Sequence, residues 1–176
     1  MNSRYEQLKS LPPYGPMYIS VTDSDGPFYS EGLVIRFFKT GGTDWVANFK
    51  PGVTDLNLLH ELELGYLLVI AGGTCYIMLP DETKPVEVFG FNYRETLYAS
   101  NGRLILQDDI GLTIIEKNGE HWDSERISWD GFENLSMEGD IVVGLSFNAG
   151  AEEWNPFTYD INTQKLTGGS FQKFIW

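Results

Sequence analysis

The stretch LLVIAGGTCYIML, residues 67–79, contains two short apolar runs separated by the pair Gly72-Gly73. Runs of four to eight residues that are rich in apolar and β-branched side chains are typical of strands. A glycine pair tolerates the positive φ of a tight hairpin turn. The stretch therefore predicts two antiparallel strands that follow each other directly in the chain.

The same pattern recurs over most of the sequence. In GLVIRFFKT, the residues Leu33, Ile35 and Phe37 alternate with their neighbours and share one face of a predicted strand. Further turn pairs are Gly41-Gly42, Asn101-Gly102, Asn118-Gly119, Asp130-Gly131 and Gly168-Gly169. Neighbouring strands should therefore be antiparallel and joined in sequence, as in a meander.

A weak internal repeat of strand, turn and aromatic strand begins near Gly41, Gly72, Asn101 and Glu138. We predict an all-β fold of three or four antiparallel meander units, either propeller-like or packed as a sandwich. The length of 176 residues fits a single domain over residues 1–176.

Two segments depart from the strand pattern. Residues 3–11, SRYEQLKSL, have apolar side chains at helical spacing and end before Pro12-Pro13, which predicts a short helix. Residues 55–64 fit either a second short helix or the beginning of the next strand, because Leu62, Leu64 and Tyr66 alternate.

Composition limits the compartment and the partners. Cys75 is the only cysteine, which predicts a buried, unreactive thiol in a reducing compartment, and we expect a cytoplasmic protein. No apolar run approaches the ~20 residues of a membrane-spanning helix, so no membrane partner is expected. The net charge of −13 argues against nucleic acid as a ligand, because phosphate binding needs clustered Lys and Arg.

The acidic residues are concentrated in the second half of the chain. Residues 108–160 contain thirteen Asp and Glu side chains against only Lys117 and Arg126. A field of this kind steers a basic partner, although acidic residues also serve solubility.

Motifs that would show catalysis are incomplete. HELEL at 60–64 lacks the second histidine of a zinc-protease helix, and GLSFN at 144–148 lacks the last glycine of a nucleophile elbow. We expect Ser146 to point outward from a strand, opposite the face shared by Ile141, Val143, Leu145 and Phe147. No cofactor and no metal site is predicted.

The segment GEHWDSERISWDG, residues 119–131, is rich in acidic and aromatic side chains and contains a histidine. His121 and Asp123 would project from one face of an extended strand, and Asp130 follows in an Asp-Gly turn, so these three are the candidate acid-base residues. The same segment also fits a strand and turn in which Trp129 anchors the core. Trp154, also beside a turn, is a second expected anchor.

Several strings resemble those of a group of small uncharacterised bacterial proteins. They are WVANFKPG (45–52), LLVIAGGTCYIM (67–78), RISWDG (126–131) and the C-terminal TGGS (167–170). The resemblance implies a bacterial intracellular protein and brings no catalytic residue with it.

Three classes of function remain open. The first is a non-catalytic protein-binding module of immunity or antitoxin type, whose acidic face binds a basic partner such as a toxin through Asp108, Asp109, Glu152 and Glu153. The second is a small carboxylate-dependent enzyme. The third is a β domain that binds a small ligand in a mouth lined by Trp45, Trp122, Trp129 or Trp154.

Overall fold

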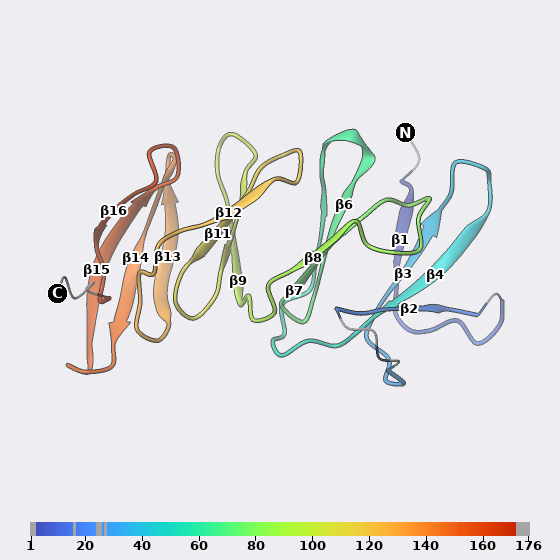
Figure 1. Ribbon diagram of the computed structural model, residues 1–176, viewed down its shortest axis with the longest axis horizontal. Helices are drawn as coiled ribbons and strands as arrows, with labels where there is room; N and C mark the ends of the chain where they lie inside the picture. Colours follow the sequence, from blue (N-terminus) through green and yellow to red (C-terminus); the bar gives the residue numbers. More distant parts are fainter. Residues whose placement is uncertain (1–2, 16, 24–25, 27, 172–176) are drawn as a thin grey trace. The chain divides into compact units, whose positions relative to one another are not determined.

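The computed structural model of the protein describes residues 3–15, 17–23, 26 and 28–171, and these residues confirm the all-β prediction (Figure 1). The described residues form four four-stranded sheets, and their one helical element is the 3-10 turn η1, Glu63–Gly65. In Figure 1 each sheet occupies one range of the colour bar, because its strands are consecutive in the sequence. Three of the four sheets have their strands in sequence order, as predicted for meander units, whereas the first sheet does not.

The chain divides into two compact units, Met1–Asn92 and Tyr93–Trp176, which we call the N-terminal and the C-terminal unit. The first sheet of the N-terminal unit contains β1 (Tyr5–Leu8), β2 (Ile19–Val21), β3 (Leu33–Phe38) and β4 (Asp44–Phe49), in the order β1-β3-β4-β2. Its second sheet is the meander β5 (Leu58–Glu61), β6 (Leu67–Ala71), β7 (Thr74–Met78) and β8 (Glu87–Phe89). Only the β2–β4 pairing in this unit is parallel among the described strands.

The two sheets of the N-terminal unit share one hydrophobic core. Phe37 and Phe49 of the first sheet pack with Tyr76 of the second, and all three are almost fully buried. Trp45 stacks on Phe37 with ring centroids 4.9 Å apart, and its Nε1 donates a hydrogen bond to the carbonyl of Pro80 at 2.9 Å. Aromatic side chains bury large areas, so they supply much of the stabilising free energy of this core.

The β6–β7 hairpin confirms the prediction from residues 67–79. Leu67–Ala71 pairs with Thr74–Met78, and every residue of both strands is buried. Cys75 is among them, so its predicted burial is confirmed. Burial on both faces explains why this stretch is continuously apolar instead of alternating.

The C-terminal unit has two meander sheets. They are β9 (Glu95–Tyr98), β10 (Leu104–Gln107), β11 (Leu112–Ile115) and β12 (His121–Asp123), followed by β13 (Phe132–Glu138), β14 (Ile141–Asn148), β15 (Glu153–Asp160) and β16 (Lys165–Gly168). Ile105 and Ile114 of the first sheet belong to the same core as Val142, Phe157 and Tyr159 of the second. This core orients the β13–β16 sheet and thus fixes which side chains its other face presents.

Both helix predictions are wrong. Residues 5–8 form β1, which pairs with β3 through Tyr5↔Phe37 and Leu8↔Val34, and residues 58–61 form β5, which pairs with β6. A helix of two or three turns is marginal in isolation, whereas a strand beside an existing sheet gains hydrogen bonds and a packed face. The alternative, in which Leu62, Leu64 and Tyr66 alternate into the next strand, is also wrong, because these residues lie in and beside the 3-10 turn η1 between β5 and β6.

Candidate functional site

Strand β14 presents its bulky side chains away from the core. Val142 and Ser146 are fully buried, and Gly144 lies between them on the core side. A Cβ on Gly144 would come within 2.6 Å of Leu135 Cδ2 and 3.3 Å of Phe157 Cε1, so large neighbours fill the space that the glycine leaves. Ile141, Val143, Leu145 and Phe147 alternate with these residues along the strand and face the other way.

Ser146 is consequently buried, and the prediction that it points outward is wrong. Its hydroxyl donates to the carbonyl of Asn155 at 3.3 Å and accepts a hydrogen bond from the backbone N–H of Ser170 at 2.8 Å. A buried hydroxyl that is satisfied in this way ties the chain after β16 to the sheet. Period-two alternation defines two faces, but it does not say which of them meets the core.

The side chains on the far side of the sheet form what we call the outer face: Ile141, Val143, Leu145, Phe147, Trp154 and Pro156. The register places Phe147 opposite Trp154 and Leu145 opposite Pro156, so the apolar side chains of β14 and β15 lie side by side. Ile141 and Trp154 are 37% and 38% exposed. Phe147 and Trp154 have ring centroids 5.0 Å apart. Val143, Leu145 and Phe147 are half-buried, and Thr158 of β15 lies opposite Val143. The outer face is thus an apolar strip along β14 that widens over Trp154 and Pro156 of β15.

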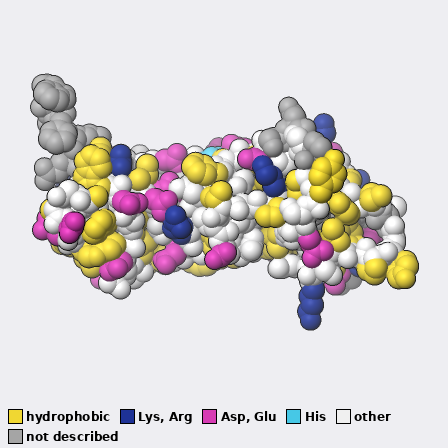
Figure 2. Space-filling model, turned by 90° about the horizontal axis from the view of Figure 1, so that it is seen from below, with side chains coloured by type: hydrophobic (Ala, Val, Ile, Leu, Met, Phe, Trp, Pro, Cys, Tyr) yellow, Lys and Arg dark blue, Asp and Glu magenta, His cyan; other side chains and the backbone are white. Residues whose placement is uncertain are grey.

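Carboxylates border this strip on both sides. Glu133 and Glu138 of β13 stand opposite Leu145 and Ile141, and Asp160 of β15 stands opposite Ile141 from the other side. Lys165 of β16 stands opposite Asp160 and contributes a positive charge to this face. Figure 2 shows acidic side chains interspersed with hydrophobic ones over the C-terminal unit, at the left of the view.

Trp129 adjoins one end of the outer face. Its backbone N–H donates to the carbonyl of Phe147 at 3.2 Å, and its ring meets Phe171 edge-on at 5.0 Å. The Arg126 guanidinium lies 4.9 Å from the Trp129 ring and 4.5 Å from the Phe171 ring. Trp129 and Trp154 do lie beside turns, but they are 39% and 38% exposed, so the expectation that they anchor the core is wrong.

The four predicted partner-binding residues fall into two pairs. Glu152 and Glu153 are exposed where the β14–β15 turn enters β15, directly before Trp154 of the outer face. Asp108 instead accepts hydrogen bonds from the N–H groups of Ile110 and Gly111, both at 2.7 Å, and Asp109 forms an ion pair with Arg94. These two aspartates therefore stabilise the β10–β11 turn.

The structure brings together two of the three candidate acid-base residues. His121 and Asp123 project from the same face of β12, because side chains alternate along a strand. Their partners in the β11–β12 register are Ile115 and Thr113. Trp122, between them, faces the other way and packs towards Tyr159. Asp123 accepts a hydrogen bond from the Thr113 hydroxyl at 2.6 Å, and Thr113 is also bonded to the Tyr93 hydroxyl at 2.7 Å. Asp130 lies in the exposed turn before β13.

Of the remaining tryptophans within the described range, Trp45 is buried in the N-terminal core and Trp122 is half-buried against Tyr159, 6.2 Å between ring centroids. Both contribute to packing within their units. Among the residues that the structure describes, no group of three or more His, Cys, Asp or Glu side chains is arranged to hold a metal ion.

The sequence did not predict the outer face, although it showed two of its features. The pattern of DIVVGLSFN showed the shared face, and the charge count showed the acidic segment. The signal that could have assigned the exposed side was the pair of small residues Gly144 and Ser146, which leave room for the large aromatic side chains of a core.

No protein-family model matches the sequence, and no curated protein is significantly similar to it. The resemblance to small bacterial proteins stays a prediction. Over the part of the chain that the structure describes, no helix has the length and apolar character needed to cross a membrane.

Proposed function

We propose that the protein is a non-catalytic protein-binding module and that the outer face binds a partner carrying both apolar and basic groups. The observation that carries the proposal is the orientation of β14, whose isoleucine, valine, leucine and phenylalanine side chains lie on the side of the sheet away from its core. Contiguous exposed apolar patches bordered by polar residues are typical of interaction sites.

The aromatic pair Phe147 and Trp154 supplies the main aromatic contact at one end of this surface. Tryptophan is enriched among the residues that dominate binding free energy, particularly where neighbouring side chains exclude water from it. The strip of β14 and β15 lies on paired strands, so its side chains need little reordering when a partner binds.

The charge pattern favours a basic partner. Glu133, Glu138 and Asp160 border the strip, and Glu152 and Glu153 lie at its Trp154 end. Acidic groups around an apolar centre favour a partner with lysine or arginine at the matching positions, and they accelerate its association. A basic toxin or nuclease neutralised by an immunity-type protein has these properties.

The test is affinity capture from a bacterial extract with three forms of the full chain: wild type, Val143→Ser/Leu145→Ser on the outer face, and Val53→Ser/Val86→Ser as a control. Val53 and Val86 are exposed valines of the N-terminal unit, 72% and 58%. We expect wild type and control to retain the same basic protein, and the outer-face variant to lose it. Equal capture by all three forms, or no specific capture, would contradict the proposal.

A further inference from the structure

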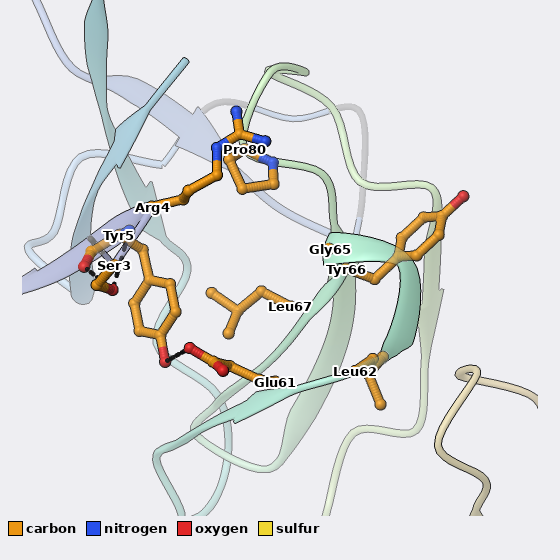
Figure 3. A pocket seen from close by; sticks show the side chains of 9 residues that line it. All are labelled: Ser3, Arg4, Tyr5, Glu61, Leu62, Gly65, Tyr66, Leu67 and Pro80. Carbon is orange, nitrogen blue, oxygen red and sulfur yellow. Dashed lines mark hydrogen bonds between the residues drawn. The ribbon is translucent and has the colours of Figure 1, made fainter. Parts of the chain in front are cut away.

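The N-terminal unit contains a partly open pocket of about 330 Å³, bordered by β1, the β5–β6 turn and the loop after β7 (Figure 3). Tyr5 and Glu61 lie on one side of it, and Pro80 and the stem of Arg4 on another, with Leu67 between them (Figure 3). Three chain segments that are distant in sequence thus build this cavity, and none of them belongs to the proposed protein-binding surface.

Most of the cavity wall is apolar and well supported. Leu62 and Leu67 are 7% and 1% exposed, and Pro80 is buried. The Trp45 indole holds the Pro80 carbonyl from the core side, and the Tyr5 ring packs against the same core. Apolar walls with a few placed polar groups are typical of small-molecule sites.

Among the described lining residues, Glu61 carries the one charge that has no ion-pair partner, and the residue is exposed to solvent. Its Oε1 accepts a hydrogen bond from the Tyr5 hydroxyl at 3.2 Å, and none of the ion pairs formed by the described residues involves Glu61. Burial and the Glu61 charge raise the pKa of Tyr5, so the hydroxyl stays protonated and remains a donor.

Arg4 also lines the cavity, but its guanidinium is already engaged. It donates to the carbonyl of Phe38 at 3.2 and 3.1 Å and forms an ion pair with Asp81 at 2.7 Å. Asp81 in turn accepts hydrogen bonds from the Thr40 N–H and hydroxyl. The arginine and aspartate charges compensate each other, which leaves the cavity with the negative charge of Glu61.

We infer that this cavity binds a small organic cation, a primary ammonium group on an apolar body, with the ammonium at Glu61 and the body against Leu62, Leu67 and Pro80. A volume of about 330 Å³ lies at the small end of the range of ligand pockets, which suits a ligand of about ten non-hydrogen atoms. The inference is independent of the proposed function, because the cavity and the outer face belong to different units.

The ammonium ion of 2-phenylethylamine and the neutral 2-phenylethanol form a matched pair of probes, since they differ in the charged group and have the same body. The full ¹⁵N-labelled chain is titrated with each, and the amide shifts of Tyr5, Gly65 and Leu67 are followed by NMR. We expect saturable shifts at these amides, with the amine binding about tenfold more tightly because a hydrogen bond to a carboxylate is charge-assisted.

Two variants test whether the preference for the amine over the alcohol depends on the carboxylate of Glu61. Glu61→Gln keeps the shape of the side chain and should remove the tenfold preference for the amine while leaving the alcohol unchanged. Glu63→Gln is the control, because Glu63 is an exposed glutamate of η1 that does not line the cavity. The inference is overturned if the amine does not saturate these amides, if the alcohol binds equally well, or if Glu61→Gln retains the preference.

A lysine side chain of a protein carries the same ammonium on a thinner body, and Nα-acetyl-lysine methylamide stands in for it. Its thinner body covers less of the apolar wall formed by Leu62, Leu67 and Pro80, so we expect this compound to bind more weakly than 2-phenylethylamine. Tighter binding of the lysine compound would overturn the inference that the ligand is a free small molecule. It would leave the proposed function of the outer face unaffected.

Discussion

Trp154 stands directly opposite Phe147 across the β14–β15 pair, and the two rings are 5.0 Å apart on the side of the sheet that faces away from the core. Aromatic pairs at this distance attract each other, so each ring restricts the other before any partner arrives. The pair therefore gives the outer face a pre-positioned aromatic contact at its Trp154 end.

We expect Trp154→Ala to lower the free energy of unfolding only modestly, by about 1 kcal/mol, because the side chain is 38% exposed and loses mainly its contact with Phe147. Tyr159→Ala on the core side of the same strand is the comparison, and it should cost about 3 to 5 kcal/mol, since Tyr159 is 1% exposed. Urea unfolding of both variants measures the difference. Equal losses would show that Trp154 serves the core after all.

Gly72→Ala should destabilise the protein by about 2 kcal/mol or more. Gly72 has a φ of +57°, and a Cβ there would overlap the backbone nitrogen of Gly52 and lie 2.5 Å from its Cα. Gly41→Ala is the matched control, because a Cβ at Gly41 meets nothing within 4 Å. Thermal and urea unfolding should place the control close to wild type. A stable Gly72→Ala variant would mean that the backbones of residues 52 and 72 do not approach each other in this way.

Asp81 should make the protein sensitive to acid. Hydrogen bonds from Arg4 and from the Thr40 N–H lower the pKa of Asp81 from 3.8 to about 2. A folded-state pKa below the unfolded value means that the stabilisation is present above about pH 4 and is lost as the pH falls towards 2.

Asp81→Asn should therefore be less stable than wild type at neutral pH, and the difference in urea midpoint should shrink between about pH 4 and pH 2. Comparing the two proteins at each pH cancels the other carboxylates. A difference that stays constant down to pH 2 would contradict the ion pair with Arg4.

Cys75 should react with thiol reagents only when the protein opens. The side chain is fully buried in β7, and burial raises the pKa of the thiol, so both access and thiolate formation are suppressed. We expect slow modification of the native protein and rapid modification in denaturing urea, followed by absorbance with a chromogenic disulfide. Rapid modification without denaturant would show that β7 is accessible.

Much of the fold could be predicted because its signals are local. The pairs at Gly41, Gly72, Asn101 and Asn118 do lie between consecutive antiparallel strands, as their turn chemistry requires. The error at residues 3–11 has the opposite cause. Tyr5 and Leu8 fit helical spacing, but pairing with β3, nearly thirty residues later in the chain, determines the outcome, and propensity cannot register such a contact.

The candidate site was only partly predictable. Its residue types can be read from one segment of the sequence, but the arrangement of their side chains depends on pairing between strands. The acidic segment was visible, but Asp109 is paired with Arg94, whereas Glu133 and Glu138 border the outer face because the register sets them opposite Leu145 and Ile141. Period-two spacing identified the two faces of β14. The side on which the core lies depended on Phe157 and Tyr159 of the next strand.

The last prediction concerns the charges beside the outer face. Glu133→Lys/Glu138→Lys should slow association with the basic partner more than it accelerates dissociation, because charges at the border of an interface act mainly on encounter. Glu152→Lys/Glu153→Lys, at the Trp154 end, should have an effect in the same direction. Stopped-flow or surface-based kinetics with the captured partner measure both rates.

Salt provides the decisive comparison. The Debye length falls from about 30 Å at 0.01 M to about 10 Å at 0.1 M, so wild-type association should slow steeply over this range and the Glu133→Lys/Glu138→Lys variant should depend on salt much less. Glu63→Lys/Glu82→Lys makes the same change in net charge at exposed positions of the N-terminal unit, so it separates the local field from the total charge. If this control slows association as much as the outer-face variant, the acidic residues act through net charge and the outer face has no steering role.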